Sequence, residues 1–197
     1  MTDSESSKSL RGSTRQRLID AMIKVVGSEG LQSASVRTIA REAGCNEAVL
    51  YQHFPGKIAM QQAIFTEIMT EMAEEKQRLA QQANDARELI ERWIAATYTF
   101  YDHKPFAFAY VYLSYPPVTP ENPSVPGPNT RIFFEAMQRL PAPSGYETYF
   151  DETSFAIFAG ALLGVPRSIH SGLLSGNAMD FYTGSIDPLS RILLRKG

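Results

Sequence analysis

Apolar residues recur at helical spacing along most of the chain, so the sequence predicts an all-α protein. A stripe through Leu18 and Met22 predicts a first helix that starts at Ser13 and that Gly30 ends. Similar stripes predict later helices over about 57–80, 85–103, 105–115, 129–140, 148–174 and 178–195. No stretch alternates apolar and polar residues over a useful length, so we expect little β-structure.

Polar and proline-rich stretches separate these helices. Residues 1–12 are Ser-rich and polar, and we expect a disordered N-terminal arm. Residues 116–128 contain six prolines and one glycine, which predicts an irregular loop. Pro166 and Pro188 interrupt the last two helical patterns, so a kink or a break is expected near each.

The stretch from Ser35 to Lys57 predicts two short helices joined by a tight turn. Ser35 and Asn46 are suited to cap the two helices, and Gly44 supplies the backbone freedom that the corner needs. The second helix turns Leu50 inward and leaves most of its other side chains outside. A helix-turn-helix with a short second helix is the geometry that enters the major groove of DNA.

The same stretch resembles the DNA-binding domain of the TetR family of bacterial transcriptional regulators. The resemblance covers about residues 13–70 and is carried by Val36-Arg37-Thr38-Ile39-Ala40, Ala43-Gly44, Leu50-Tyr51-Gln52-His53-Phe54 and Lys57. It implies an all-α fold in two parts. An N-terminal three-helix helix-turn-helix domain over 13–56 would join a C-terminal helical ligand-binding and dimerisation domain over 57–197.

The resemblance also implies which residues contact DNA. By position these are Ser35, Arg37, Asn46, Glu47, Ala48, Val49, Tyr51, His53 and Lys57. Hydroxyl, imidazole and ammonium groups among them can donate to phosphate oxygens, which fixes the register on the duplex. The stretch 46–49 departs from the residues common in the family, so we expect it to determine which bases are read.

Aromatic residues gather in 93–115, which holds nine of the 21 in the chain. Four are tyrosines between Tyr98 and Tyr112, and a buried phenol hydroxyl needs a hydrogen-bond partner. A mainly apolar cavity with a few polar groups would use such residues, as would core and interface packing. Small-molecule sensing in this region is what the resemblance implies. The candidate ligand residues are Trp93, Tyr98, Tyr101, Phe108 and Tyr112.

The segment 155–164 is apolar on almost every side, so it must be buried on every side. It is either central to one chain or part of a four-helix bundle with a second copy, and the resemblance favours the second copy. Small residues spaced by four would let another helix approach closely. The candidate interface residues are Ala156, Gly160, Leu163 and Gly164.

Charge and cysteine content refine this interpretation. The chain has a net charge of −2, but residues 1–60 carry 8 Lys and Arg against 6 Asp and Glu. This modest basic excess lies at the end that would face DNA phosphates. The single cysteine, Cys45, excludes an intrachain disulfide and favours a reducing cytoplasm. A buried turn residue is a simpler account of Cys45 than a redox sensor, and the longest apolar run, 155–165, is too short to span a bilayer.

Together these features predict a ligand-responsive, DNA-binding transcriptional regulator in the cytoplasm. The expected form is a homodimeric repressor that a small apolar or aromatic molecule releases from a palindromic operator. The alternative is a small-molecule-binding or carrier protein whose helix-turn-helix makes protein contacts. The three histidines, His53, His103 and His170, are scattered and lack partners at catalytic spacing. We therefore expect no enzyme activity, catalytic residue, metal site or cofactor.

Overall fold

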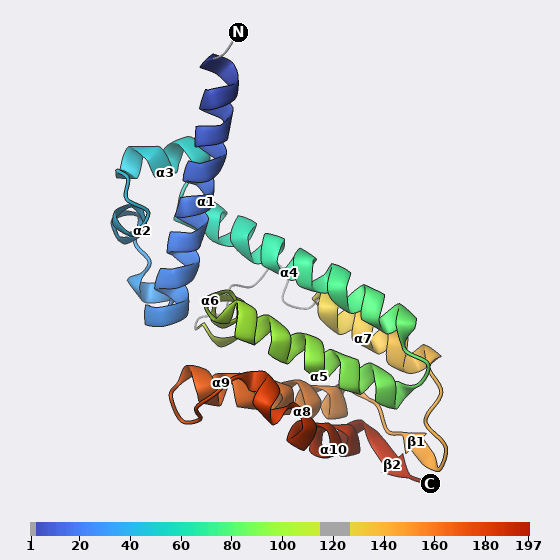
Figure 1. Ribbon diagram of the computed structural model, residues 1–197. Helices are drawn as coiled ribbons and strands as arrows, with labels where there is room; N and C mark the ends of the chain where they lie inside the picture. The colour runs from blue at the N-terminus through green and yellow to red at the C-terminus, as the bar shows by residue number, and fades with distance from the viewer. Residues whose placement is uncertain (1–2, 115–126) are drawn as a thin grey trace. The chain divides into compact units, whose positions relative to one another are not determined.

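The computed structural model describes residues 3–114 and 127–197, and these are mostly helical (Figure 1). The first described stretch contains α1 (Asp3–Glu29), the 3-10 helix η1 (Leu31–Ser33), α2 (Val36–Glu42), α3 (Glu47–His53), α4 (Lys57–Gln82), α5 (Ala86–His103), α6 (Pro105–Phe108) and the π-helix η2 (Ala109–Leu113). The second contains α7 (Pro128–Arg139), β1 (Tyr146–Thr148), α8 (Glu152–Leu162), α9 (Gly164–His170), the 3-10 helix η3 (Ala178–Phe181), α10 (Tyr182–Leu193) and β2 (Leu194–Lys196). The predicted all-α class is confirmed.

These elements form two compact units, which we call the first unit and the second unit. The first unit is built from the chain up to Ile68 together with the segment that starts at Phe106. The second unit is built from Met69–Pro105 and from α7 onward. The chain therefore passes between the units within α4 and again where α5 gives way to α6. The functional division at residue 56 stays a prediction.

The core of the first unit holds the helix-turn-helix in place. Leu18 and Met22 on α1 are fully buried, as are Ile39 on α2 and Leu50 on α3. Gly30 ends α1 with a φ of 82°, as the sequence predicted. Helix α1 begins at Asp3, however, ten residues before the predicted start at Ser13, and the disorder of residues 1–12 stays a prediction. Most residues before Ser13 have moderate or good helix propensity, which lets the helix continue through the predicted cap.

A close backbone approach occurs between α1 and α6, both in the first unit. A Cβ added at Gly27 would lie 2.7 Å from the carbonyl oxygen of Phe106 and 2.9 Å from its Cα. The π-helix η2, which follows α6, contacts α4, because the Tyr110 hydroxyl donates to the Gln61 carbonyl at 3.0 Å. Gly27 was not singled out from the sequence, where it lies in an ordinary helical pattern.

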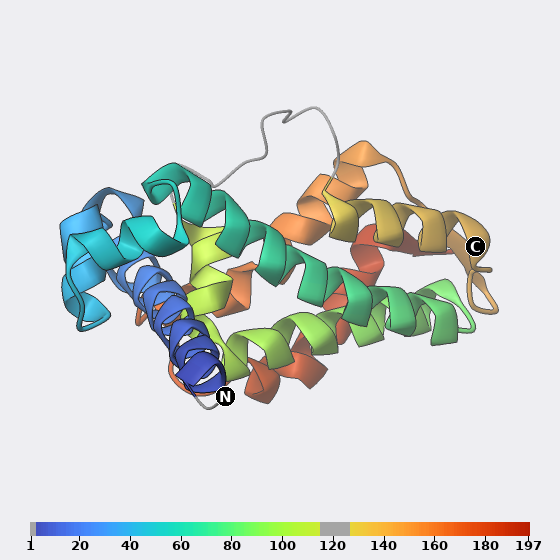
Figure 2. The same ribbon diagram turned by 90° about the horizontal axis from the view of Figure 1, so that it is seen from above.

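In the second unit, α4 from Met69 onward and α5 lie side by side, and α5 also packs on α7 and α10 (Figures 1 and 2). The aromatic core centres on Phe133 of α7. Its ring meets Trp93 edge-on at 4.9 Å between centroids and stacks on Phe158 of α8 at 5.2 Å. None of the described helices is long and apolar enough to cross a membrane.

The C-terminal helices differ from the prediction at their ends. The predicted helix over 148–174 begins only at α8 and breaks at Leu163, before Pro166, as the proline suggested. Pro188 instead lies inside α10. Residues 194–196 form β2, which pairs antiparallel with β1, a contact across about 50 residues that helical spacing alone does not reveal. Most of the predicted proline-rich loop lies outside the described residues.

Candidate functional site

Side-chain caps shape the helix-turn-helix of the first unit. The Ser35 hydroxyl accepts from the backbone N–H of Thr38 at 3.0 Å and begins α2. The Asn46 side-chain oxygen accepts from the N–H of Val49 at 3.1 Å and begins α3. Gly44 turns the corner with a φ of 67°, which non-glycine residues rarely adopt. Both caps and the turn residue are those that the sequence predicted.

The predicted DNA-contact residues lie on the outer side of this motif. Leu50 and Phe54 are buried, whereas Glu47, Ala48 and Tyr51 of α3 are exposed. Six of the nine are exposed: Ser35, Arg37, Asn46, Glu47, Ala48 and Tyr51. The other three, Val49, His53 and Lys57, are half-buried. All nine come from α2, α3, their caps and the first residue of α4.

Charge on this surface is available for an anionic partner. Within the described residues, neither Arg37 nor Lys57 forms an ion pair. The acidic Glu42 of α2 is already paired with Lys24 of α1 at 2.6 Å. Arg37 and Lys57 can therefore donate to phosphate oxygens without first losing a carboxylate partner.

One residue beside this surface escaped the sequence reasoning. Ile58 in the first turn of α4 is 70% exposed and adjoins Lys57. It is out of phase with the buried stripe of α4, which runs through Met60 and Ile64. Because Ile58 falls outside the helical spacing of these buried residues, the sequence itself indicated that its side chain would be exposed. An exposed apolar residue here is suited to contact a thymine methyl or a sugar.

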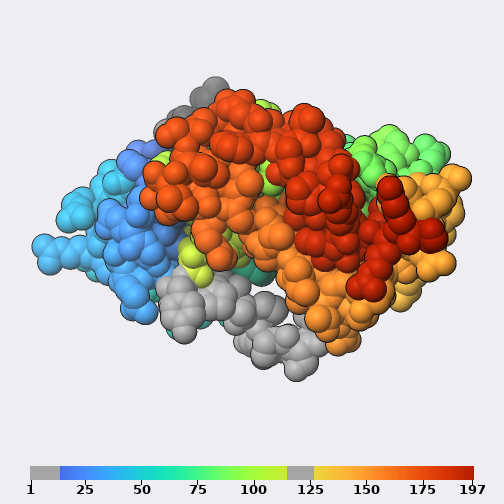
Figure 3. All heavy atoms as spheres, turned by 90° about the horizontal axis from the view of Figure 1, so that it is seen from below, coloured from blue at the N-terminus to red at the C-terminus, as the bar shows by residue number. Residues whose placement is uncertain are grey.

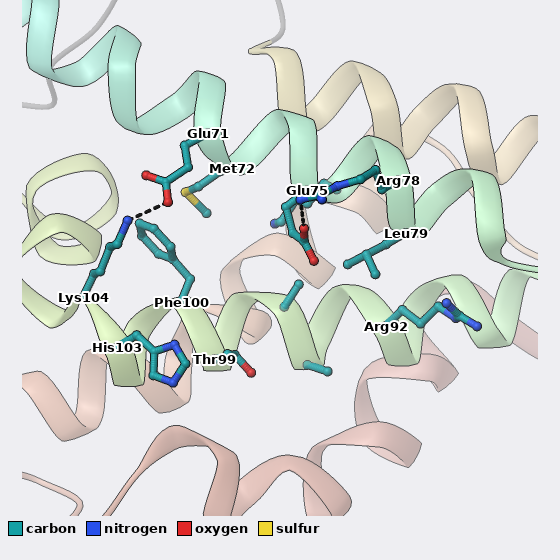
Figure 4. Close-up of a pocket in the computed structure, with 13 residues that line it drawn as sticks. Glu71, Met72, Glu75, Arg78, Leu79, Arg92, Thr99, Phe100, His103 and Lys104 are labelled. Carbon is teal, nitrogen blue, oxygen red and sulfur yellow. Dashed lines mark hydrogen bonds and ion pairs between the residues drawn. The ribbon is translucent and has the colours of Figure 1, made fainter.

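A groove of about 470 Å³ lies between α4 and α5 in the second unit (Figure 4). Apolar contacts come from Met72 and Leu79 on α4 and from Ala95, Ala96 and Phe100 on α5. Charged and polar side chains complete the lining: Glu71, Glu75, Lys76, Arg78, Arg92, Thr99, His103 and Lys104. The Lys104 ammonium donates to Glu71 at 2.6 Å, and Glu75 pairs with Arg78. The groove can accept a small molecule with an apolar body.

Lys76 in this groove is buried, with 4% of its surface exposed. Its ammonium donates to the Thr97 hydroxyl at 3.2 Å and lies 4.2 Å from the centre of the Trp93 ring. Burial lowers the pKa of Lys76 from its ordinary value to about 7, because the charged form loses its hydration. Sequence reasoning missed Lys76. The signal was its place in the apolar stripe of α4, four residues after Met72 and four before Ala80.

The structure divides the five predicted ligand residues between the two units. Trp93, Tyr98 and Tyr101 lie in α5, and all three are buried. Phe108 and Tyr112 lie in the first unit with ring centroids 5.0 Å apart. None of the five lines the groove between α4 and α5. Their role in a cavity stays a prediction.

Tyrosine hydroxyls in this region already have protein partners. The Tyr98 hydroxyl donates to Ser185 on α10 at 3.0 Å, and Tyr110 is bonded to the Gln61 carbonyl. Burial raises the pKa of both phenols, so they remain neutral donors at physiological pH. These two tyrosines therefore have the hydrogen bonds that core positions require.

Small and apolar residues are exposed on one face of α8. Ala156 and Gly160 are exposed, Leu163 and Gly164 are half-buried, and Ile157 is 56% exposed. In this chain α8 is thus not buried on every side. Helices α8, α9 and α10 form a continuous surface in the space-filling view (Figure 3). A Cβ at Gly160 would meet no atom within 4 Å, so packing within the chain does not require glycine there.

Other candidate chemistry is sparse in the described residues. Cys45 is a free thiol in the turn before α3 and is half-buried rather than fully buried as expected. No group of three His, Cys, Asp or Glu side chains in the described part could hold a metal ion. His103 lines the groove. The carboxylate of the neighbouring Asp102 accepts from the N–H groups of Ala178 and Met179, the first two residues of η3.

The sequence profile described as "Bacterial regulatory proteins, tetR family" matches residues 18–64, which contain the whole helix-turn-helix. A transcription regulator of the TetR family from Marinobacter aquaeolei VT8 has a similar fold, with a TM-score of 0.73 over 96% of this chain and 100% of that one, at 17% identity. The helix-turn-helix region of this chain belongs to the TetR family. Its profile match ends within α4, so the groove, the aromatic core and α8 lie outside the matched residues.

Two further proteins that are similar to this chain carry ligand information in their names. The nicotine-responsive transcriptional repressor HdnoR of Paenarthrobacter nicotinovorans is 36% identical over 78 residues, which are 40% of each chain. The regulator FadR of Bacillus subtilis was solved in complex with stearoyl-CoA. It has a TM-score of 0.65 and 16% identity over 88% of this chain and 96% of its own. The aligned part thus spans less than half of the curated relative, and the second likeness concerns the fold alone.

Proposed function

We propose that this TetR-family protein is a ligand-responsive transcriptional regulator that binds DNA through α2 and α3. The observation that carries the proposal is the helix-turn-helix, whose α3 is capped, supported by a buried core and open on its outer face. This is the geometry of a recognition helix in the major groove. The repressor role is supported by HdnoR, which is named a repressor.

The proposed mechanism has two states that differ in DNA affinity. A small molecule binds the second unit and favours the state that releases the operator, by as much as its affinity differs between the states. The groove between α4 and α5 supports this proposal, because it offers apolar contacts and polar groups together. The response of HdnoR to nicotine and the binding of stearoyl-CoA by FadR support small-molecule control of this protein.

DNA binding is tested by selecting bound duplexes from a random pool and titrating the selected DNA in a mobility shift. Binding through phosphate contacts should weaken at least about 100-fold between roughly 50 and 200 mM salt, because counterions compete for the same oxygens. A carrier protein that uses its helix-turn-helix for protein contacts would enrich no sequence and show no such salt dependence. Either of these two results would reject the proposed function.

A homodimer is proposed through the exposed face of α8. Two copies of the recognition helix on a symmetric body would match a palindromic site with half-sites about 34–36 Å apart or a multiple of that distance. Exposed small residues on α8 would let a partner helix approach, and Ile157 would add apolar area. The proposed contact residues are Ala156, Gly160, Leu163 and Gly164.

Gly160→Leu is expected to weaken the dimer at least about tenfold, since the added side chain occupies the space where a second helix would pack. Leucine is a better helix former than glycine, so the monomer should keep its fold. Sedimentation across a range of concentrations measures the dimerisation constant. Gln138→Leu adds the same side chain at an exposed position of α7 and serves as the control. Equal dimerisation of both variants would place the interface elsewhere.

A further inference from the structure

Lys76 is the charged group of the α4–α5 groove that has no ion-pair partner. It occupies a buried position in the stripe of α4, between Met72 and Ala80. Its ammonium has one hydrogen-bond acceptor among the described residues, the Thr97 hydroxyl, and no carboxylate within 4.0 Å there. The Thr97 hydroxyl donates in turn to the Trp93 carbonyl at 2.8 Å, so it serves Lys76 only as an acceptor.

The other ionised side chains that line the groove are already neutralised. Glu71 pairs with Lys104, Glu75 pairs with Arg78, and Arg92 pairs with Glu88 at 2.6 Å. The lining therefore contains four cations but only two carboxylates, and the cation without an ion pair is the buried one. Burying a charge without an opposite charge is unfavourable, and buried charges in proteins are normally paired.

The groove also has room and apolar surface beside this amine. Figure 4 shows Phe100, Glu71 and Lys104 at one end of the groove, with Leu79 and Arg92 toward the other. Two alanines of α5, Ala95 and Ala96, leave space between the helices. The Lys76 ammonium lies against Thr97 and Trp93, which do not line the groove, so the flexible four-carbon chain of lysine must turn to present it to a group that enters from the groove.

We propose that this groove binds an anionic effector with an aromatic or alkyl body, whose acidic group pairs with the ammonium of Lys76. This inference rests on the proposed ligand-responsive function and narrows the apolar or aromatic class expected from the sequence to acids. The anion supplies the opposite charge that Lys76 lacks. The body of the effector covers the apolar surface of α4 and α5.

Two dyes of matched shape test the proposal. The anionic probe is 1-anilinonaphthalene-8-sulfonate, and the uncharged probe is N-phenyl-1-naphthylamine, which has the same rings without the sulfonate. Fluorescence titration at pH 6.5 gives both dissociation constants. Lys76→Met keeps the volume and removes the amine, so we expect at least about tenfold weaker binding of the anionic dye. Binding of the uncharged dye should stay within about twofold.

Lys104→Met removes an exposed cation from the same groove and is the matched control. It should leave the affinity for the anionic dye within about twofold, because that ammonium is solvated and already paired with Glu71. The proposal is overturned if Lys76→Met leaves the anionic dye unaffected. It is also overturned if both dyes are lost equally, since Lys76 would then only shape the groove. Circular dichroism confirms the fold, and Lys76→Gln provides a second neutral variant.

The pH dependence of the wild-type protein gives an independent measurement. Burial lowers the pKa of Lys76 to about 7, so the free protein carries the ammonium below that pH and loses it above. An anion raises the pKa of Lys76 in the complex. Affinity for the sulfonate dye should therefore be highest below pH 7 and fall by up to about tenfold per pH unit above it. Binding of the uncharged dye should not change, and a flat profile for the anionic dye would overturn the proposal.

Other charged groups near the groove must be separated from this effect. On α4 these groups are Glu71, Glu75 and Arg78, and on α7 the group is Arg139. On α5 and at Lys104, which follows it, they are Glu88, Arg92, His103 and Lys104. His103 lines the groove as well and carries an imidazole. His103→Gln should therefore keep the fall in affinity, whereas Lys76→Met should abolish it; the reverse result would assign the effect to His103 and reject the proposal.

The dye measurements involve no DNA, so the two proposals fail separately. If binding of the anionic dye requires Lys76 but no DNA duplex is selected, the proposed anion site is supported and the proposed regulator function is rejected. If selected DNA is bound but the affinity for the anionic dye is unchanged in the Lys76 variant, the regulator function is supported and the anion site is rejected.

Discussion

Replacing both Tyr51 and Lys57 by alanine lowers the affinity for selected DNA roughly 100-fold, since each change removes a donor to a phosphate oxygen. Tyr51 is 56% exposed on α3, and Lys57 begins α4 without an ion pair among the described residues. Neither side chain belongs to the buried core behind α3. The loss should therefore appear in mobility shifts while the thermal unfolding midpoint stays the same.

The matched control changes the same residue types in the second unit. Tyr149 is 44% exposed and Lys196 lies at the end of β2, far along the chain from the recognition helix. The double variant Tyr149→Ala and Lys196→Ala should bind selected DNA as well as the unchanged protein does. Comparable affinity for both double variants would show that the α3 surface does not face DNA.

Gly27→Ala is expected to lower the free energy of unfolding by about 2 kcal/mol, because the new methyl group collides with backbone. Its Cβ would lie 2.7 Å from the Phe106 carbonyl oxygen, and a backbone atom cannot move aside as a flexible side chain can. Alanine is otherwise the better helix former, which makes a loss of stability diagnostic. Urea unfolding followed by circular dichroism measures the change.

The same substitution at Gly184 gives the opposite expectation. Gly184 lies in α10, where an added Cβ meets no atom within 4 Å. Gly184→Ala should raise the free energy of unfolding by about 0.5–1 kcal/mol through helix propensity and reduced chain entropy. If Gly27→Ala also stabilised the protein, α6 would not approach α1 as closely as described.

The local features of the first unit were predictable from the sequence because short-range chemistry determines them. Ser35 and Asn46 cap helices through bonds to N–H groups three residues away, and Gly30 and Gly44 take positive φ angles. Each of these choices depends on a few neighbouring residues. The buried Leu50 follows from helical periodicity in the same way.

Features that depend on distant segments were not predictable in the same way. The pairing of β1 with β2 joins Tyr146 to Lys196, and Gly27 is required because Phe106 comes close. Tyrosine content alone also does not show whether a hydroxyl will bond to a ligand or to the protein. The partner of Tyr98 proved to be Ser185, 87 residues later. The burial of Lys76 was indicated by its phase in α4, but the charge of lysine argued against it.

The α4–α5 groove has a topological property that follows from chain connectivity alone. Its two walls are the two helices through which the polypeptide leaves and re-enters the first unit, within α4 after Ile68 and beyond α5 before Phe106. A molecule that separates these two helices therefore acts on two of the three covalent connections between the units, the third being between η2 and α7. Shortening or stiffening either of these two connections should alter how strongly occupancy of the groove is transmitted, even with every groove contact preserved.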